Sequence, residues 1–272
     1  MKFVQSRNNP LVRSMRALHY NKVRRSKRQF LIEGVRLLEE AVISGCDIDT
    51  VLYCPEMTID TRTLDLLNNL QGKGVTIVAT TEAVLSSVSE TKSPQGIVAT
   101  VCFPIMPKPN SIIEGANLMV LGDMIQDPGN TGTIIRTAEA VGAGGVFFTA
   151  GSVYPFSGKE IRASMGSLFR LPVIILDDNG QKLCNYCLDN DWQIVFTVPE
   201  GGIPWWQVNF KQPTLLVLGN EGSGISHELL DLEGIKASIP LVSPVESLNV
   251  AVAGAVVLFE TIRQQSCSGG CK

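Results

Sequence analysis

Between residues 118 and 240, short apolar runs alternate with segments of helical periodicity, and this pattern restricts the fold more than any other feature of the chain. The runs are rich in β-branched residues and predict strands at 118–121, 145–149, 171–176, 193–198, 214–218 and 237–240. Strands that are apolar along their whole length are buried on both faces, as in a parallel sheet covered by helices. The sequence therefore predicts an α/β fold.

The stretch 103–110 divides the chain, because it holds three prolines within six residues. Proline can neither continue a helix nor pair in a central strand. Before this stretch the pattern predicts a basic helix, further helices at 34–44 and near 61–71, and strands at 50–54, 75–79 and 97–102. We therefore expect a small α/β domain at residues 1–107 and a larger domain at residues 108–272.

Basic residues are concentrated at the amino end. Nine lysines and arginines precede the first acidic residue, Glu33, whereas the rest of the chain carries 14 basic and 26 acidic residues. Clustered cations raise the local concentration of phosphate groups. The sequence therefore predicts a polyanionic partner at this end, with an ordinary solvated helix as the alternative.

The longest apolar run, 250–259, has ten residues, and a membrane span needs about 18. No membrane partner is expected. Seven cysteines, an odd number in a chain with an ample core, favour a reducing compartment, and we expect the cytoplasm. Cys184 and Cys187 are predicted to pack inside an amphipathic helix. A zinc site that they form with Cys267 and Cys271 is the alternative, although no metal is expected.

Three segments follow predicted strands at the edge where parallel sheets bind ligands, namely 123–132, 219–224 and 243–249. In the second, Gly219, Gly222 and Gly224 either let the backbone approach a ligand or serve a tight turn. The chain has two histidines and no dinucleotide-binding or P-loop fingerprint. It therefore offers little support for hydride transfer, nucleotide hydrolysis or histidine-dependent zinc hydrolysis.

Polar residues in these segments are candidates for a site. Asn130 begins a helix that is predicted through Val141, and Arg136 projects from the noncore face of that helix as a phosphate clamp or a solvated cation. Glu221 lies in the glycine-rich turn, where a carboxylate either caps backbone N–H groups or serves a site. Ser247 is predicted to cap a helix, 248–263, with Asn249 in its first turn. This helix is apolar on nearly all sides and must be buried on all of them, and a second subunit is a natural source of that cover.

Three motifs resemble the ordered motifs of the SpoU/TrmH-type RNA ribose 2′-O-methyltransferases of the SPOUT class. They are Asp127-Pro-Gly-Asn-Thr-Gly-Thr-Ile-Ile-Arg136, Leu218-Gly-Asn-Glu-Gly-Ser-Gly-Ile225 and the pair Ile239-Pro-Leu241 with Ser247-Leu-Asn-Val-Ala-Val-Ala253. The amino end, from Ser6-Arg-Asn-Asn-Pro10 to Gly34, is similar to the substrate-recognition domain of the same family.

This resemblance implies a SPOUT parallel sheet whose carboxyl-terminal chain forms a trefoil knot, preceded by a small α/β RNA-recognition domain. It also implies a homodimer that completes the active site. The expected reaction is methyl transfer from S-adenosylmethionine to a ribose 2′-hydroxyl of RNA, most often ribosomal RNA and alternatively transfer RNA. A noncatalytic RNA-binding protein with the same fold and a nucleotide-dependent oxidoreductase are the other hypotheses.

The resemblance also assigns residues. It implies a catalytic cluster of Asn130, Arg136, Glu221, Ser247 and Asn249. Arg136 is the family's proposed base, but a guanidinium with a pKa above ~12 makes an unusual base, so we expect it first to position phosphate and ribose. Cofactor contacts are expected from Thr149, Leu218, Gly219, Asn220, Gly222, Ile239, Leu241 and Leu248.

Overall fold

The computed structural model describes residues 2–57, 60–91, 93–242 and 245–266. The chain divides into two compact units. Unit 1 contains the residues up to Ile105 together with Phe156–Phe169, and unit 2 contains Met106–Pro155 and the chain from Arg170 onward. The break between 105 and 106 lies two residues from the predicted boundary, whereas the sequence analysis placed residues 156–169 in the second domain.

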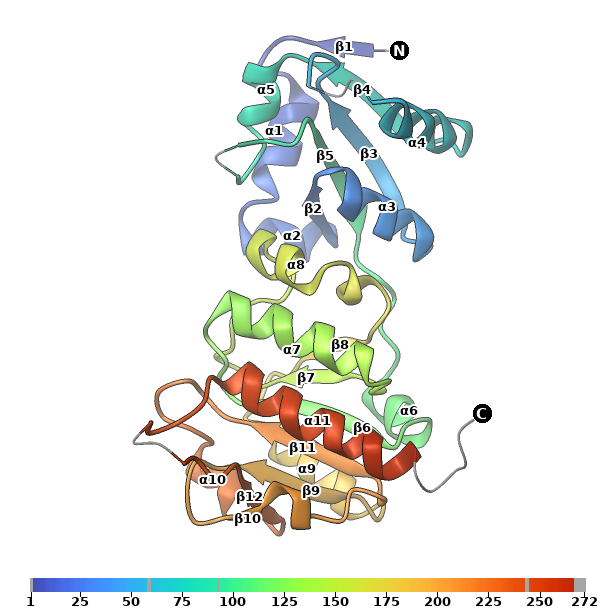
Figure 1. Ribbon diagram of the computed structural model, residues 1–272. Helices are drawn as coiled ribbons and strands as arrows, with labels where there is room; N and C mark the ends of the chain where they lie inside the picture. Colours follow the sequence, from blue (N-terminus) through green and yellow to red (C-terminus); the bar gives the residue numbers. More distant parts are fainter. Residues whose placement is uncertain (1, 58–59, 92, 243–244, 267–272) are drawn as a thin grey trace. The chain divides into compact units, whose positions relative to one another are not determined.

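Unit 1 is built on a five-stranded sheet with the order β1-β4-β3-β5-β2 (Figure 1). Strands β1, β4 and β3 are parallel, and β5 is antiparallel to both of its neighbours. The strands are β1 (Lys2–Val4), β2 (Gln29–Glu33), β3 (Ile48–Tyr53), β4 (Thr76–Thr80) and β5 (Ile97–Cys102). The sequence analysis did not predict β1 and β2, since both are short edge strands next to a strongly basic segment.

Helices cover both faces of this sheet. On one face, Val12 and Met15 of α1 and Val84 and Leu85 of α5 pack on a cluster that includes Leu52 of β3. Helices α3 and α4 cover the other face (Figure 1). The helices are α1 (Pro10–Ala17), α2 (Asn21–Lys27), α3 (Val35–Ile43), α4 (Thr61–Gly72) and α5 (Glu82–Ser86).

Residues 156–169 join unit 1 through aromatic packing. They form α8 (Gly158–Ser164) and the short 3₁₀ helix η1 (Ser167–Phe169). The ring of Phe156 lies 5.6 Å from that of Phe30 and 4.6 Å from that of Phe103, and the ring of Phe169 lies 6.2 Å from that of Phe30. Such aromatic pairs bury a large area, which explains why the segment packs with strands far away in sequence.

Unit 2 is built on a seven-stranded sheet with the order β10-β12-β9-β11-β6-β7-β8, and all its described pairings are parallel. The predicted parallel α/β fold is therefore confirmed. The strands are β6 (Leu118–Gly122), β7 (Val146–Phe148), β8 (Val173–Ile175), β9 (Gln193–Thr197), β10 (Ile203–Pro204), β11 (Thr214–Leu218) and β12 (Ile235–Ser238). Only the two-residue β10 was not predicted.

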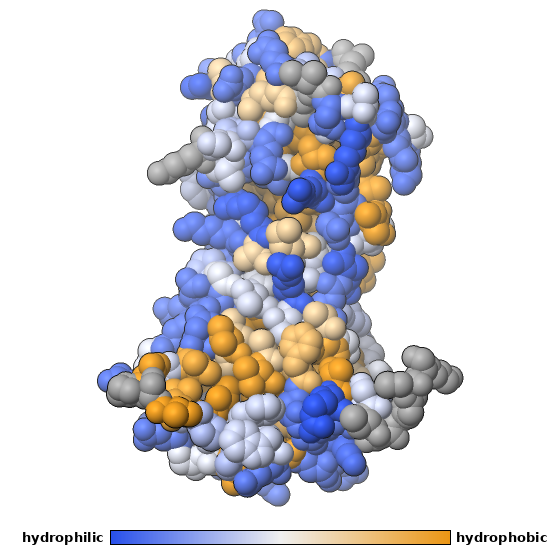
Figure 2. All heavy atoms as spheres, in the orientation of Figure 1, coloured by the Kyte–Doolittle hydropathy of each residue, from blue (hydrophilic) through white to orange (hydrophobic). Residues whose placement is uncertain are grey.

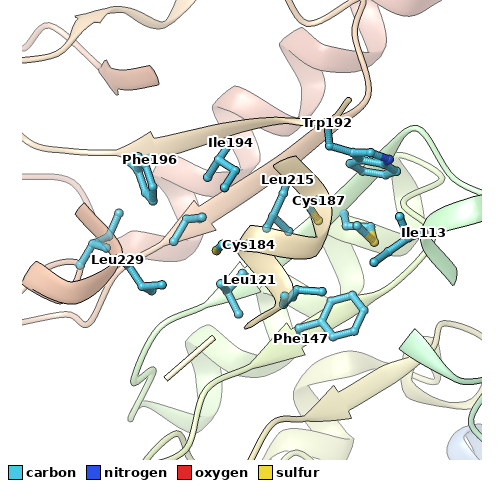
Figure 3. Packing of buried hydrophobic residues seen from close by; sticks show 14 of the residues in the cluster. Ile113, Leu121, Phe147, Cys184, Cys187, Trp192, Ile194, Phe196, Leu215 and Leu229 are labelled. Atoms are coloured by element: carbon cyan, nitrogen blue, oxygen red, sulfur yellow. The ribbon is translucent and has the colours of Figure 1, made fainter. Parts of the chain in front are cut away.

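The faces of this sheet carry different helices. Helices α6 (Pro109–Glu114), α9 (Gln181–Leu188) and α10 (His227–Leu230) pack on one face in a large apolar cluster. Figure 3 shows Cys184 and Cys187 of α9 in this cluster, near Leu121, Phe147 and Leu215. The two cysteines therefore pack in the core, as predicted; Cys267 and Cys271 lie outside the described residues.

Helices α7 (Pro128–Ala140) and α11 (Val250–Ser266) lie together on the other face (Figure 1). Gly254 permits the close approach of α11 to β11, since a Cβ at this position would lie 2.8 Å from a methyl carbon of Leu218. In the single chain, Val252 of α11 is 50% exposed and Phe259 is 56% exposed. The expected enclosure of this helix on all sides, with a second subunit as part of the cover, stays a prediction. No helix of the described ranges is long and apolar enough to cross a membrane.

The packing of α9 generates a prediction about its thiols. Burial raises the pKa of Cys184 and of Cys187 to about 12. Because the thiolate is the reactive form, we expect neither to react with iodoacetamide at pH 8 in the folded protein, and both to react in guanidinium chloride. Mass spectrometry of the labelled peptides checks this. Rapid labelling of either cysteine in the folded protein would contradict the described packing.

Candidate functional site

A cavity of about 370 Å³ lies in unit 2 at the carboxyl ends of the strands. This volume is within the usual range for small-molecule sites. Its walls come from the segments that follow β9, β11 and β12 and from the first turns of α11. The lining residues are Thr197, Val198, Pro199, Gly219, Asn220, Glu221, Gly222, Gly224, Ala237, Ile239, Leu241, Ser247, Leu248, Asn249, Val250, Ala253 and Val257.

The loop after β11 presents backbone to this cavity. The backbones of Asn220 and Gly224 exchange two hydrogen bonds of 2.9 and 3.0 Å, and the side-chain oxygen of Asn220 accepts from the N–H groups of Gly222 and Ser223. A Cβ at Gly219 would lie 2.4 Å from the carbonyl carbon of Gly224 and from the nitrogen of Ile225. A side chain at Gly219 would therefore force this tight loop apart.

The buried side chain of Asp123 links the segments that follow β6, β7 and β11 by hydrogen bonds. Asp123 follows β6 and is 2% exposed; it accepts hydrogen bonds from the Thr149 hydroxyl (3.0 Å) and from the Ser226 N–H (2.8 Å). The Thr149 oxygen also accepts from the Met124 N–H at 2.8 Å. Thr149 is fully buried and does not line the cavity. Its observed role is thus to link the end of β7 to the loop after β6.

Three segments far apart in sequence meet at Asn130. The Asn130 side-chain N–H donates to the Glu221 carboxylate at 2.9 Å, and the Asn249 side-chain N–H donates to the Asn130 side-chain oxygen at 2.9 Å. Glu221 also accepts from the backbone N–H groups of Gln126 (3.2 Å) and Asp127 (3.0 Å). The chain of contacts Glu221–Asn130–Asn249 therefore connects the loop after β11 to the starts of α7 and α11.

The charge of Glu221 is favoured by these contacts. Burial by itself raises the pKa of this carboxyl group, but the hydrogen bonds from Asn130 and from the backbone N–H groups outweigh it and hold the pKa below its usual value. A charged acceptor makes stronger hydrogen bonds than a neutral one. The carboxylate therefore holds the two loops together at neutral pH.

The helix starts beside the site are capped by local side chains. Asp127 accepts from the Asn130 N–H at 2.8 Å and begins α7. Asn249 accepts from the N–H groups of Ala251 and Val252 and begins α11. The prediction that Ser247 caps this helix is wrong, because the helix starts two residues later than that cap requires; Ser247 lines the cavity instead.

The structure separates Arg136 from these groups. Its side chain is exposed on α7, as predicted, and it makes no hydrogen bond or ion pair with any residue that the structure describes. It does not line the cavity. Leu218 is also outside the lining, being fully buried in β11 beneath Gly254. The guanidinium is therefore free to meet a ligand that approaches from solvent.

Sequence reasoning missed the wall formed by Thr197, Val198 and Pro199, which follows β9. The rule that ligands bind at the carboxyl ends of parallel strands applies to β9 as much as to its neighbours. The sequence carries no signal there, because Val198 and Pro199 are apolar and the Thr197 hydroxyl donates to the Val217 carbonyl of the neighbouring strand. Among the described residues, no group of three His, Cys, Asp or Glu side chains is placed to hold a metal ion.

Both parts of the chain match known families. Residues 117–259 match the model of the SpoU rRNA Methylase family, and residues 9–99 match that of the MRM3-like substrate binding domain. An uncharacterized tRNA/rRNA methyltransferase of Synechocystis is 36% identical, with 96% of this chain and 94% of that protein covered. The 23S rRNA (guanosine(2553)-2′-O)-methyltransferase RlmP of Bacillus subtilis is 34% identical, with 95% and 98% covered.

Solved structures show the same similarity. The AdoMet-bound rRNA methyltransferase from Sinorhizobium meliloti superposes with a TM-score of 0.82 at 31% identity, covering 96% of this chain and 97% of that one. The SpoU methyltransferase AviRb from Streptomyces viridochromogenes, in complex with AdoMet, superposes with a TM-score of 0.86 at 29% identity, covering 97% and 100%.

The glycine-rich loop generates a prediction with its own control. We expect Gly219→Ala to lower the free energy of unfolding by about 1–3 kcal/mol, because the added methyl group meets backbone that cannot move without opening the loop. At Gly222 the nearest atom to an added Cβ is 3.6 Å away, so Gly222→Ala should change stability by less than about 0.5 kcal/mol. Urea unfolding measures both; equal stabilities would contradict the described loop.

Proposed function

The chain belongs to the SpoU rRNA methylase family, and we propose that it transfers a methyl group from S-adenosylmethionine to a ribose 2′-hydroxyl of ribosomal RNA. The observation that carries this proposal is the contact chain Glu221–Asn130–Asn249 beside a glycine-lined cavity. All three motifs of the resemblance contribute to that arrangement. Relatives named as 23S rRNA methyltransferases favour ribosomal over transfer RNA.

The cavity fits S-adenosylmethionine by its chemistry. Backbone of Gly219, Asn220 and Gly222 forms one wall, and the apolar side chains of Ile239 and Leu241 lie at the edge of the same space. No lysine or arginine is among the described lining residues, so no cation there opposes a positively charged ligand. We propose that these residues, with Leu248, hold the cofactor. When bound, it supplies an electrophilic methyl group on a positively charged sulfur.

The protein's own groups must place the nucleophile. A ribose 2′-hydroxyl is a weak nucleophile, so the rate depends on holding it in line with the methyl group. Glu221 fixes the orientation of the Asn130 amide, which in turn holds Asn249 at the start of α11. We propose that this rigid junction sets the position of the ribose, and that Ser247 contributes to the same cluster.

Arg136 is assigned to the RNA side of the reaction. Its guanidinium is exposed and lacks a partner among the described residues, so it can bind a phosphate with two parallel hydrogen bonds. A group with a pKa above ~12 is a poor base at neutral pH. We therefore propose that Arg136 positions the phosphate and ribose of the target nucleotide.

Unit 1 supplies RNA recognition in this proposal. Residues 9–99 match a substrate binding domain, and the basic residues of the amino end lie within the predicted domain 1–107. Relatives named as bacterial ribosomal RNA methyltransferases support a cytoplasmic location. The knotted path of the carboxyl-terminal chain stays a prediction.

We also propose a homodimer that covers α11. One side of this helix carries an apolar stripe at i, i+4 and i+7, formed by Val252, Val256 and Phe259. The first and last residues of the stripe, Val252 and Phe259, are at least half exposed. Figure 2 shows apolar side chains gathered over this part of unit 2, where Val242 and Val245 before α11 are also exposed. A contiguous apolar surface marks an interface. The next face of α11 lines the cavity, so a second copy on this stripe would lie beside the active site.

The reaction and the role of Arg136 are tested together. The wild type should bind S-adenosylmethionine but not NAD in calorimetry, and should transfer labelled methyl to a 2′-oxygen of ribosomal RNA. Arg136→Ala should reduce transfer by roughly 10²-fold or more while cofactor affinity stays within a few-fold, because the guanidinium contacts RNA. Arg136→Lys should restore little, since a point charge lacks the planar fork. Near wild-type transfer by Arg136→Ala would refute the assignment.

The dimer is tested by light scattering. We expect a mass of twice 29.4 kDa at micromolar concentration. Phe259→Asp should produce a folded monomer with much reduced methyl transfer, because the side chain is exposed in the single chain but would be buried against a second copy. Ile43→Asp alters a 76% exposed apolar residue of unit 1 and should leave the dimer intact. An active wild-type monomer would exclude the dimer.

A further inference from the structure

The corner between α1 and α2 carries an exposed aromatic residue within a basic surface. Tyr20 is 72% exposed and lies between the two helices. Arg13 is exposed on α1, Arg16 is half-buried near its end, and Tyr20 follows in the turn that leads to α2. Val12 and Met15 of α1 pack in the core. The exposed tyrosine therefore closely follows a helix whose charged side chains are both arginines.

The backbone at Tyr20 is held firmly by both helices. Its N–H donates to the Ala17 carbonyl at 3.1 Å, and its carbonyl accepts from the N–H groups of Val23 and Arg24 at 3.0 and 3.1 Å. These bonds fix the point from which the ring projects. A ring held in this way loses little conformational freedom when a ligand covers it.

A buried guanidinium stabilises the same corner. Arg24 is 5% exposed and donates to the Leu18 carbonyl at 2.7 Å and to the His19 carbonyl at 3.1 Å. It also donates to the Ser157 hydroxyl at 2.9 Å, within the same unit. The buried Arg24 side chain thus satisfies two carbonyl groups that follow α1, while the Tyr20 side chain is exposed to solvent.

The charged side chains of the two helices beside Tyr20 are all basic. No acidic residue occurs before Glu33, and α1 and α2 carry the exposed cations Arg13, Lys22, Arg25 and Lys27. Glu90, which contacts this region, is paired with His19 at 2.9 Å and with Arg162 at 3.7 Å. The surface of these two helices therefore favours an anionic ligand.

We propose that Tyr20 is a stacking platform for an unpaired base of the RNA, and that Arg13, Arg16 and Lys22 hold the phosphates on either side of it. An aromatic ring among cations fits single-stranded RNA, because bases stack on the ring while the backbone follows the positive charge. This assignment deepens the proposed function and rests on it. The site lies in unit 1 and acts on RNA binding, not on the methyl transfer step.

The test compares variants that remove the Tyr20 ring, remove only its hydroxyl, or shorten another exposed side chain. The probe is an unmethylated in vitro transcript of 23S ribosomal RNA with the full-length protein and S-adenosylmethionine. Tyr20→Ala should raise the KM for the transcript roughly 5- to 150-fold, the range expected for loss of one stacked base. The kcat at saturating RNA and the Kd for S-adenosylmethionine should not change. Tyr20→Phe keeps the ring and should behave as wild type, as should Ile43→Ala, which shortens a similarly exposed side chain on α3.

The roles of Arg13 and Lys22 are tested by the salt dependence of RNA binding. Arg13→Gln and Lys22→Gln should each lower the salt dependence of the RNA Kd by about one phosphate contact. Lys73→Gln, an exposed cation at the end of α4, should leave it unchanged. A Tyr20→Ala KM within twofold of wild type would overturn the proposal, as would equal effects of Lys73→Gln and Lys22→Gln. Displacement of the transcript by polyglutamate at equal charge would identify a general anion site and would also overturn it.

These outcomes are distinct from failure of the proposed function. If the wild type binds the transcript through Tyr20 but transfers no methyl group, the enzymatic assignment fails and the stacking site stands. If it transfers methyl groups and Tyr20→Ala does so with the same KM, the stacking site fails and the enzymatic assignment stands. Absence of RNA binding by the wild type would refute both.

Discussion

The hydrogen bonds of one carboxylate, Glu221, hold together the loops after β6 and β11 in unit 2. This group accepts from the backbone of Gln126 and Asp127 and from the side chain of Asn130, which accepts in turn from Asn249. Each bond alone contributes modestly, but together they join segments that begin 91 and 119 residues apart. The junction therefore adds polar contacts at the starts of α7 and α11 to the direct packing of the two helices.

The parallel sheet makes that junction possible. Its strands all end at the same edge, so the segments after β6, β9, β11 and β12 converge without any of them being close in sequence. Gly219 lets the backbone of the loop after β11 pack closely beside the cavity, and the hydrogen bond between buried Asp123 and Thr149 links the segments that follow β6 and β7.

The two units differ in the charge of the surfaces that they offer to a ligand. Unit 2 offers a cavity without lysine or arginine among its described lining residues and one exposed guanidinium on α7, as expected where a positively charged cofactor and a polyanion meet. Unit 1 presents an exposed aromatic residue between two helices whose charged side chains are all basic. Residues 156–169 belong to unit 1 although their neighbours in the chain form unit 2. The chain therefore passes between the units at three places, near residues 105, 155 and 169.

The sequence by itself determined the strands of unit 2, the core position of Cys184 and Cys187, and the loops that carry Asn130, Glu221 and Asn249. Those features follow from local periodicity and from motifs in which order and spacing are visible along the chain. The tertiary structure alone decided that Asn249 rather than Ser247 caps α11, that Thr149 is buried below the cavity, and that residues 156–169 pack against Phe30 and Phe103. It also showed that the single chain leaves Phe259 of α11 exposed, so the complete burial that the composition predicts would need a second copy. These outcomes depend on which surfaces pack together in three dimensions. The elements involved lie far apart in the sequence, and local periodicity does not show which of them will meet.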